Sequence, residues 1–142
     1  MTTWLDLAQL ITGLAMAGLI WTVQLVVYPA FLHLTPENFP AAHASHSRRI
    51  SLIVSPLLLL EWGATLAWFL GAGAPLSGLQ YGIASCVTVA FLSTALIQIP
   101  LHHRLGRGWN TRLLHTLINT NWIRTLAWTG KAILAVLMLR SN

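Results

Sequence analysis

The sequence predicts an all-α integral membrane protein, an antiparallel four-helix bundle. Of its 142 residues, 56% are hydrophobic and only 8% are charged, and the mean hydropathy is +0.68. A soluble domain carries about 25% charged residues, so the deficit of charge is large. The chain also holds four apolar stretches, each close to the roughly 20 residues that a helix needs to cross a bilayer. We therefore expect a single four-span membrane domain over residues 1–142.

The predicted spans cover about residues 7–28, 50–70, 79–99 and 122–139. Pro29 and Pro100 mark the predicted ends of spans one and three, because proline interrupts a regular helix. The link between spans two and three is short and uncharged, which predicts an antiparallel pair. Between spans three and four, four apolar residues follow helical spacing and predict a short interfacial helix: Leu113, Leu114, Leu117 and Ile118.

The histidines and most arginines fall in the two loops on one face of this bundle. These loops are residues 32–49 and 101–121, and they hold His33, His43, His46, His102, His103, His115, Arg48, Arg49, Arg104, Arg107 and Arg112. By the positive-inside rule this face is cytoplasmic and both termini lie outside. The basic residues flank apolar spans and form no groove with interleaved aromatic residues, so we expect no nucleic-acid partner.

Two opposite charges, Glu61 and Lys131, fall inside the apolar spans. Glu61 lies 11 residues past Ile50, about 16 Å into the bilayer, and Lys131 lies nine residues past Trp122, about 14 Å from the same face. An isolated charge at this depth costs at least about 2.5 kcal/mol, so we expect the two side chains to contact each other. Such a pair either locks the packing of spans two and four or, with a tuned carboxylate, serves a pocket as proton acceptor or substrate anchor.

Polar residues from all four spans converge toward the histidine face and predict a pocket that opens to the cytoplasm. His43 and His46 are three residues apart, which on a helix places both on one face as candidate metal ligands together with His102. Thr94, Gln98 and His102 recur every four residues and predict a polar stripe on span three. The other predicted lining residues come from span one and from one face of span four: Gln24, Tyr28, Asn121, Arg124 and Lys131.

The residues present restrict the chemistry of this pocket. A carboxylate-bridged di-iron centre requires about four glutamates. The chain has two, Glu37 and Glu61, so a single chain cannot form such a centre. What remains is a metal held by histidines, a haem with histidine ligands, or acid-base chemistry without a metal. The candidate catalytic residues are His46 and His102 for ligation or proton transfer, Arg124 for anchoring an anionic or phenolate substrate, and Glu61.

Several short motifs resemble those of small bacterial four-span membrane proteins, most of them uncharacterised. They are Tyr28-Pro29-x-Phe31, His43-x-x-His46-x-x-Arg49-Ile50, the span around Glu61, Pro100-x-His102-x-x-Leu105 and Asn121-Trp122-Ile123-Arg124-Thr125. More distantly the layout is similar to the anthrone-oxygenase-like family, although His102 stands where that family has asparagine. The resemblance implies a four-helix membrane bundle and, for the distant family, oxidation of a polycyclic phenol at a site reached from one membrane face.

We therefore predict an oxidoreductase-like enzyme of the bacterial inner membrane that acts on a small hydrophobic or phenolic substrate, with a histidine-ligated metal or haem as candidate cofactor. The alternative is a non-enzymatic protein, either a small transporter or a structural subunit of a membrane complex. In that case the Glu61 to Lys131 pair stabilises the packing. Besides the lipid bilayer, a second copy of the chain is a candidate partner, with Ala15, Gly18 and Trp21 as the contact.

Overall fold

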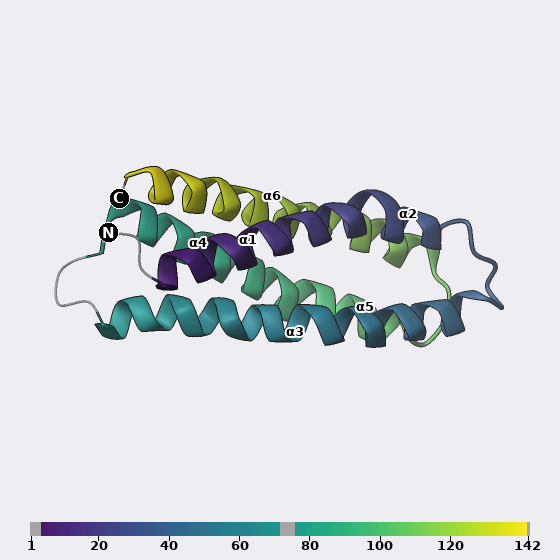
Figure 1. The fold of residues 1–142 in the computed structure, drawn as a ribbon. Helices are drawn as coiled ribbons and strands as arrows, with labels where there is room; N and C mark the ends of the chain where they lie inside the picture. Colours follow the sequence, from purple (N-terminus) through teal and green to yellow (C-terminus); the bar gives the residue numbers. More distant parts are fainter. Residues whose placement is uncertain (1–3, 72–75, 142) are drawn as a thin grey trace.

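The computed structural model describes residues 4–71 and 76–141, and every regular element within these ranges is helical. Four long helices run antiparallel, with the two termini at one end of the bundle (Figure 1). Two of them contain a π-helical turn (η). In chain order the elements are α1 (Trp4–Thr22), η1 (Val23–Val27), α2 (Tyr28–Phe31), α3 (Phe39–Gly71), α4 (Gly78–Ser93), η2 (Thr94–Gln98), α5 (Ile99–Leu105) and α6 (Thr111–Ser141).

Each of the four long helices is long and apolar enough to cross a membrane. Large apolar side chains cover their outer faces, for example Leu25, Leu59, Leu70 and Leu96, which are between 59% and 79% exposed. Such a surface suits lipid and not water. The chain is a multi-pass membrane protein, and the predicted all-α bundle of four spans is confirmed.

The first and third long helices continue past the prolines that were expected to end them. Before Pro29, the Tyr28 N–H donates to the carbonyl of Val23, and before Pro100 the Ile99 N–H donates to the carbonyl of Thr94. These bonds reach five residues back, as in a π-helix. Proline has no N–H and its ring crowds the carbonyl four residues back, so the wider turn relieves that clash without ending the helix. The predicted ends at residues 28 and 99 are therefore too early.

The second and fourth long helices begin before their predicted starts. Helix α3 begins at Phe39, so His43 and His46 lie on a helix and the loop before them shrinks to residues 32–38. Helix α6 begins at Thr111 and runs without interruption to Ser141. The predicted separate interfacial helix is thus wrong, and its residues form the first turns of α6. No glycine or proline lies between Thr111 and Trp122, so nothing there ends the helix.

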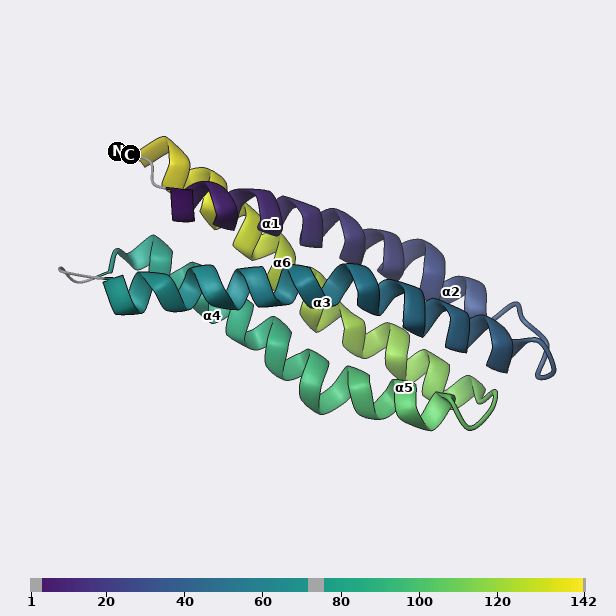
Figure 2. The ribbon, with the colours of Figure 1, turned by 60° about the horizontal axis from the view of Figure 1, so that its bottom comes forward.

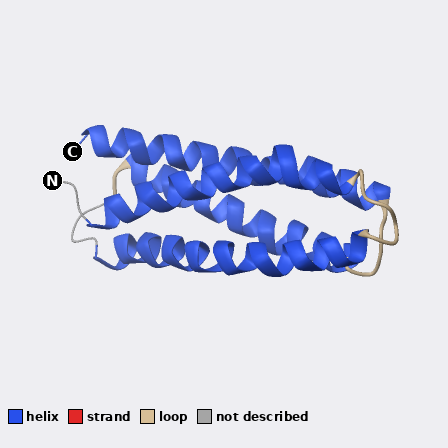
Figure 3. Ribbon diagram, turned by 45° about the vertical axis from the view of Figure 1, so that its right-hand side comes forward, coloured by secondary structure: helices blue, strands red, loops and turns tan. Residues whose placement is uncertain are grey.

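Helix α6 packs between α1 and α4, while α3 packs mainly on α1. Beside the link between them, α3 and α4 meet through the ring pairs Trp62–Phe91 and Phe69–Tyr81, whose centroids lie 5.3 and 6.1 Å apart. Residues 72–75 of that link lie outside the described residues. The helix formed by α4, η2 and α5 crosses behind α3 in the view of Figure 2. Toward the other end, which carries the loops 32–38 and 106–110, the His43 and His102 rings join α3 to α5, with centroids 5.1 Å apart. Figure 3 shows these two loops together at one end of the bundle.

Candidate functional site

A cavity of about 540 Å³ lies between α3 and the segments α1, η1, η2 and α5. Its walls are largely aliphatic and come from α1, η1, α3 and α5: Met16, Leu19, Ile20, Val23, Ile50, Val54, Leu58 and Ile99. Polar groups gather toward the loop end: Tyr28, His43, Gln98, His102 and Arg124. All five of these belong to the set predicted from the sequence, and each of the four long helices contributes at least one.

His102 lies at the centre of the polar end of the cavity, between two partners. The Tyr28 hydroxyl is 2.9 Å from His102 Nε2, and His43 Nε2 is 2.9 Å from His102 Nδ1. A neutral imidazole has one donor and one acceptor nitrogen, so the two hydrogen bonds of this chain of three groups must point in the same direction. The phenol can donate to His102 while His102 donates to His43, or the order is reversed. We call this chain the Tyr28–His102–His43 relay.

Arg124 presents a buried positive charge beside the relay. Its guanidinium adjoins the Tyr28 phenol, and among the described residues no carboxylate faces it. Arg124 Nη1 donates to Asn121 Oδ1 at 3.3 Å, and Asn121 Nδ2 donates to Gln24 Oε1 at 2.8 Å. Gln24 Nε2 donates to the carbonyl of Ile118 at 3.1 Å. Gln24 and Asn121, both predicted to line the cavity, are not among its lining residues. They form a hydrogen-bonded chain that holds Arg124 in position.

Gln98 supplies a buried acceptor at the cavity wall. Its Nε2 donates to Thr120 Oγ1 at 3.0 Å, whereas its Oε1 has no hydrogen-bond partner among the described residues. Thr94, Gln98 and His102 all line the cavity, so the predicted polar stripe is confirmed. On a regular α-helix, residues four apart drift by about 40° at each step. The wider turn of η2 reduces this drift and keeps the three side chains on one face.

The three histidines predicted to hold a metal are close together but are not arranged as ligands. The His46 ring lies 6.4 Å from that of His102, between centroids, and His46 Nε2 is buried without a partner among the described residues. Both ring nitrogens of His102 are engaged, by Tyr28 and by His43. Within the described ranges, no group of three His, Cys, Asp or Glu residues is placed to hold a metal ion. The residues in this arrangement do not fit a three-histidine metal site.

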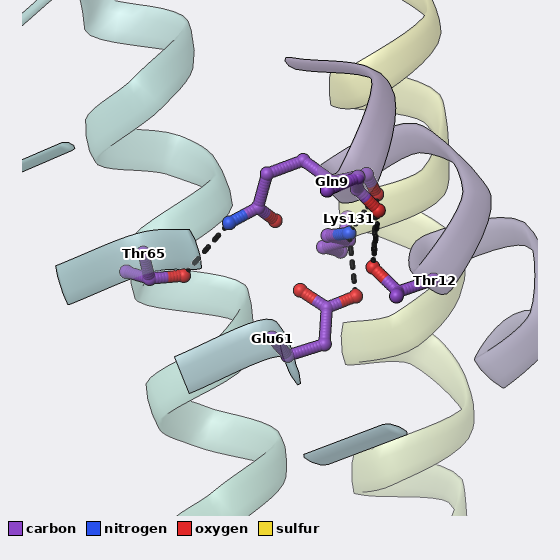
Figure 4. A network of polar contacts seen from close by, with 6 residues as sticks. Gln9, Thr12, Glu61, Thr65 and Lys131 are labelled. Carbon is purple, nitrogen blue, oxygen red and sulfur yellow. Dashed lines mark hydrogen bonds and ion pairs between the residues drawn. The ribbon is translucent and has the colours of Figure 1, made fainter. Parts of the chain in front are cut away.

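Glu61 and Lys131 form the predicted contact, in a separate buried network with Gln9 and Thr65. Lys131 Nζ lies 2.6 Å from Glu61 Oε1, and both side chains are fully buried (Figure 4). Lys131 also donates to the carbonyl oxygen of Gln9, and Gln9 Nε2 donates to Thr65 Oγ1 at 3.0 Å. The predicted contact is therefore confirmed.

The ion pair does not line the cavity, although Glu61 and Lys131 were predicted to belong to it. Neither Glu61 nor Lys131 is among its lining residues, and the lining ends at Met16 and Leu58. Glu61 follows His46 by 15 residues along α3, a distance of about 22 Å at the rise of an α-helix. The two groups were predicted to share one pocket because depth alone does not tell which helix face a residue occupies.

Three serines that line the cavity were not among the predicted site residues. Ser47, Ser51 and Ser55 follow one another at four-residue spacing along α3, and all three contribute to the lining. The spacing was visible in the sequence as one face of a helix. It was missed because the helix was expected to begin near Ile50, which separates Ser47 from the other two.

The predicted contact between copies of the chain is partly used within the molecule. Trp21 Nε1 donates to Thr129 Oγ1 at 3.0 Å, and the Trp21 ring packs edge-to-face on Trp122 at 5.5 Å. These contacts join α1 to α6 and account for the indole without a second copy. Self-association through this face stays a prediction.

Comparisons with protein-family models, curated proteins and solved structures find no match to this chain. The resemblance to the anthrone-oxygenase-like family therefore remains an expectation. What the protein does has to be inferred from the cavity, the relay and the buried arginine.

Proposed function

We propose that the protein is a membrane-embedded enzyme that binds a small hydrophobic phenol in the cavity and removes its hydroxyl proton, as a step in oxidoreductase chemistry. One observation carries this proposal: the Tyr28–His102–His43 relay and the charged Arg124 meet at one end of an otherwise aliphatic cavity. Aliphatic walls suit a hydrocarbon or aromatic body. The relay and the guanidinium suit an acidic hydroxyl and the anion that it leaves.

The proposed step moves one proton along the relay. The substrate hydroxyl gives its proton to the Tyr28 oxygen while Tyr28 gives its own proton to His102 Nε2. His102 then passes the proton on Nδ1 to His43 Nε2, so the net products are a phenolate and a protonated His43. Arg124 stabilises the phenolate, and the low dielectric of the buried site strengthens that attraction. A phenolate gives up electrons more readily than the neutral phenol, which is why deprotonation would precede oxidation.

We assign no step to a metal or a haem. A metal ligand needs a free nitrogen lone pair, and both nitrogens of His102 are engaged by Tyr28 and His43. The acid-base chemistry that the sequence left open is the one these contacts support.

A pocket with one polar end supports an enzyme over a transporter. Beyond Met16 and Leu58 the bundle is filled by an apolar cluster that includes Trp68, Ile83 and Met138, and the Glu61 to Lys131 pair is fully buried. A transporter would need polar groups leading to both ends of the bundle, and the cavity leads to one.

A phenol with a visible phenolate band tests the proposal directly. Purified protein in detergent is titrated with 4-nitrophenol below the pH at which the free phenol ionises, and the bound phenolate is read from its absorbance. Wild type should bind it as phenolate. Arg124→Gln should weaken binding by about 1.5 to 3 kcal/mol, the usual worth of a hydrogen bond to a charged group. Tyr28→Phe should bind the probe in its neutral form, because the relay has lost its first member.

Arg112→Gln is the matched control, since Arg112 is an exposed arginine on the same helix. It should bind like the wild type. If wild type and Arg124→Gln bind the nitrophenolate equally, or if neither binds it at all, the proposed function is wrong.

We also propose that the polar end of the cavity faces the cytoplasm of a bacterial cell, because the arginines of the loops 32–49 and 101–121 lie at that end. Single cysteines at Arg107 and Ser141, each in a Cys86→Ala background, test the orientation with a maleimide that cannot cross membranes. In intact cells the cysteine at position 141 should react and the one at 107 should not. The reverse pattern would overturn the orientation and leave the cavity chemistry untouched.

A further inference from the structure

The seam between α3 and the helix formed by α4, η2 and α5 is bridged by side chains on both sides of the cavity. Between the cavity and the link that joins the helices, it is closed by the ring pairs Trp62–Phe91 and Phe69–Tyr81. Toward the loops 32–38 and 106–110 it is closed by the His43 and His102 rings, whose centroids lie 5.1 Å apart and whose nitrogens are 2.9 Å apart. Between these contacts the cavity lies in the seam, backed by Met16 and Ile20 of α1 and bordered by Ser51 and Ser55 of α3 and by Ile99 of α5.

The cavity opens in this seam, and the edges of the opening lie at membrane depth. Ser51 and Ser55 on α3 and Ile99 on α5 line the cavity and are also exposed, Ile99 to 59%. Ser55 is five residues into the apolar run that begins at Ile50, about 8 Å along the helix. Leu96, next to the opening, is 70% exposed, as a lipid-facing residue would be. The opening thus faces the hydrocarbon core of the bilayer and not only the aqueous loops.

Small side chains on α3 make room for this opening without adding polarity. Ser51 Oγ donates to the carbonyl of Ser47 at 2.8 Å, so its hydroxyl is satisfied within the helix. At the inner end, by contrast, Gln98 is 1% exposed and its Oε1 has no partner among the described residues. The passage from the opening to the inner end therefore goes from hydrocarbon-like walls to an unpaired acceptor, the relay and a cation.

We propose that this opening is a lateral portal through which a phenol with a hydrocarbon tail enters from the bilayer, head first. Its hydroxyl reaches Tyr28 and Arg124, and its tail lies along Ser51, Ser55 and Ile99 and extends into the lipid. This inference rests on the proposed function, since it names the class of substrate for the same cavity. A tail that stays in the membrane also explains why the aliphatic lining continues to the lipid-facing surface.

The test compares two probes on protein in liposomes: 4-nitrophenol, and 4-nitrophenol that carries a long alkyl chain beside the hydroxyl. Both should be bound as phenolates by the wild type. Ser55→Trp fills the portal and should slow binding of the alkylated probe at least about tenfold, a change of 1.4 kcal/mol in the barrier. Leu52→Trp, at a position that is 74% exposed and does not line the cavity, is the matched control and should bind at the wild-type rate.

The outcomes separate the portal from the proposed function. If wild type binds neither probe, the proposed function itself fails. If it binds 4-nitrophenol but not the alkylated probe, or if Ser55→Trp and Leu52→Trp bind the alkylated probe equally fast, the portal is wrong and the function stands. A second measurement does not depend on a bulky variant: an alkylated phenol with a photoreactive group in its tail should label Ser51, Ser55 or Ile99. Labelling confined to the loops 32–38 and 106–110 would overturn the portal.

Discussion

Removing one partner of the Glu61 to Lys131 pair should destabilise the protein far more than removing both. The charges lie 2.6 Å apart and both side chains are 0% exposed. At an effective dielectric constant of about 20, their attraction is about 6 kcal/mol. Desolvation of each ion costs several kcal/mol, so the net contribution of the pair to stability is small. A single charge left alone in the same place loses the attraction and keeps its desolvation cost.

We therefore expect Lys131→Met to lower the free energy of unfolding by about 3 to 5 kcal/mol, the usual cost of stranding a buried charge. Glu61→Gln should cost less, because its amide can still accept a hydrogen bond from Lys131. The double variant Glu61→Leu with Lys131→Met should recover most of the loss, since it leaves no charge and adds apolar packing. The gain measures the coupling of the two side chains.

Unfolding by sodium dodecyl sulfate in mixed micelles, followed by the circular dichroism of the helices, measures these free energies. Binding of 4-nitrophenol to the same variants is the second measurement, and it should be unchanged wherever the protein is folded, because neither residue lines the cavity. If the single variants each cost less than about 1 kcal/mol and their effects add, the pair is not the buried, coupled unit described above.

Gly13→Ala should lower the free energy of unfolding by about 1 to 3 kcal/mol, because a Cβ there would lie 2.7 Å from Lys131 Nζ. Gly18→Ala on the same helix meets nothing within 4 Å and should be neutral or stabilising, and equal losses in the two variants would contradict this reasoning. Gln24→Leu should cost about 1 to 3 kcal/mol by leaving a buried donor on Asn121 without its acceptor. In the same unfolding assay, Asn121→Leu should cost less when added to Gln24→Leu than it costs in the wild type, because the acceptor of its amide is already gone, whereas additive losses would show that the two amides are not coupled.

The sequence predicted what depends on depth and on helical spacing. Equal depth brought Glu61 and Lys131 together correctly, because a buried charge in lipid has few inexpensive partners. Four-residue spacing placed Gln98 and His102 on one face correctly. The cavity could not be predicted, because it depends on how α3 crosses α1 and α5, and that crossing is set by packing between helices and not by the pattern within one. For the same reason the ion pair and the relay were assigned to a single pocket.

The prolines were the most misleading signal, and the reason connects the fold to the site. Pro29 and Pro100 each follow a π-turn, and the residues just beyond these turns include Tyr28 and His102, the two that meet at 2.9 Å. A π-turn holds about one residue more than an α-turn, so it rotates everything after it by roughly 100° relative to a continuous α-helix. The turns that let the helices pass the prolines are therefore also what sets the direction in which the relay residues project. A sequence pattern counted in α-helical turns finds the right residues on each side of such a turn and assigns the wrong angle between them.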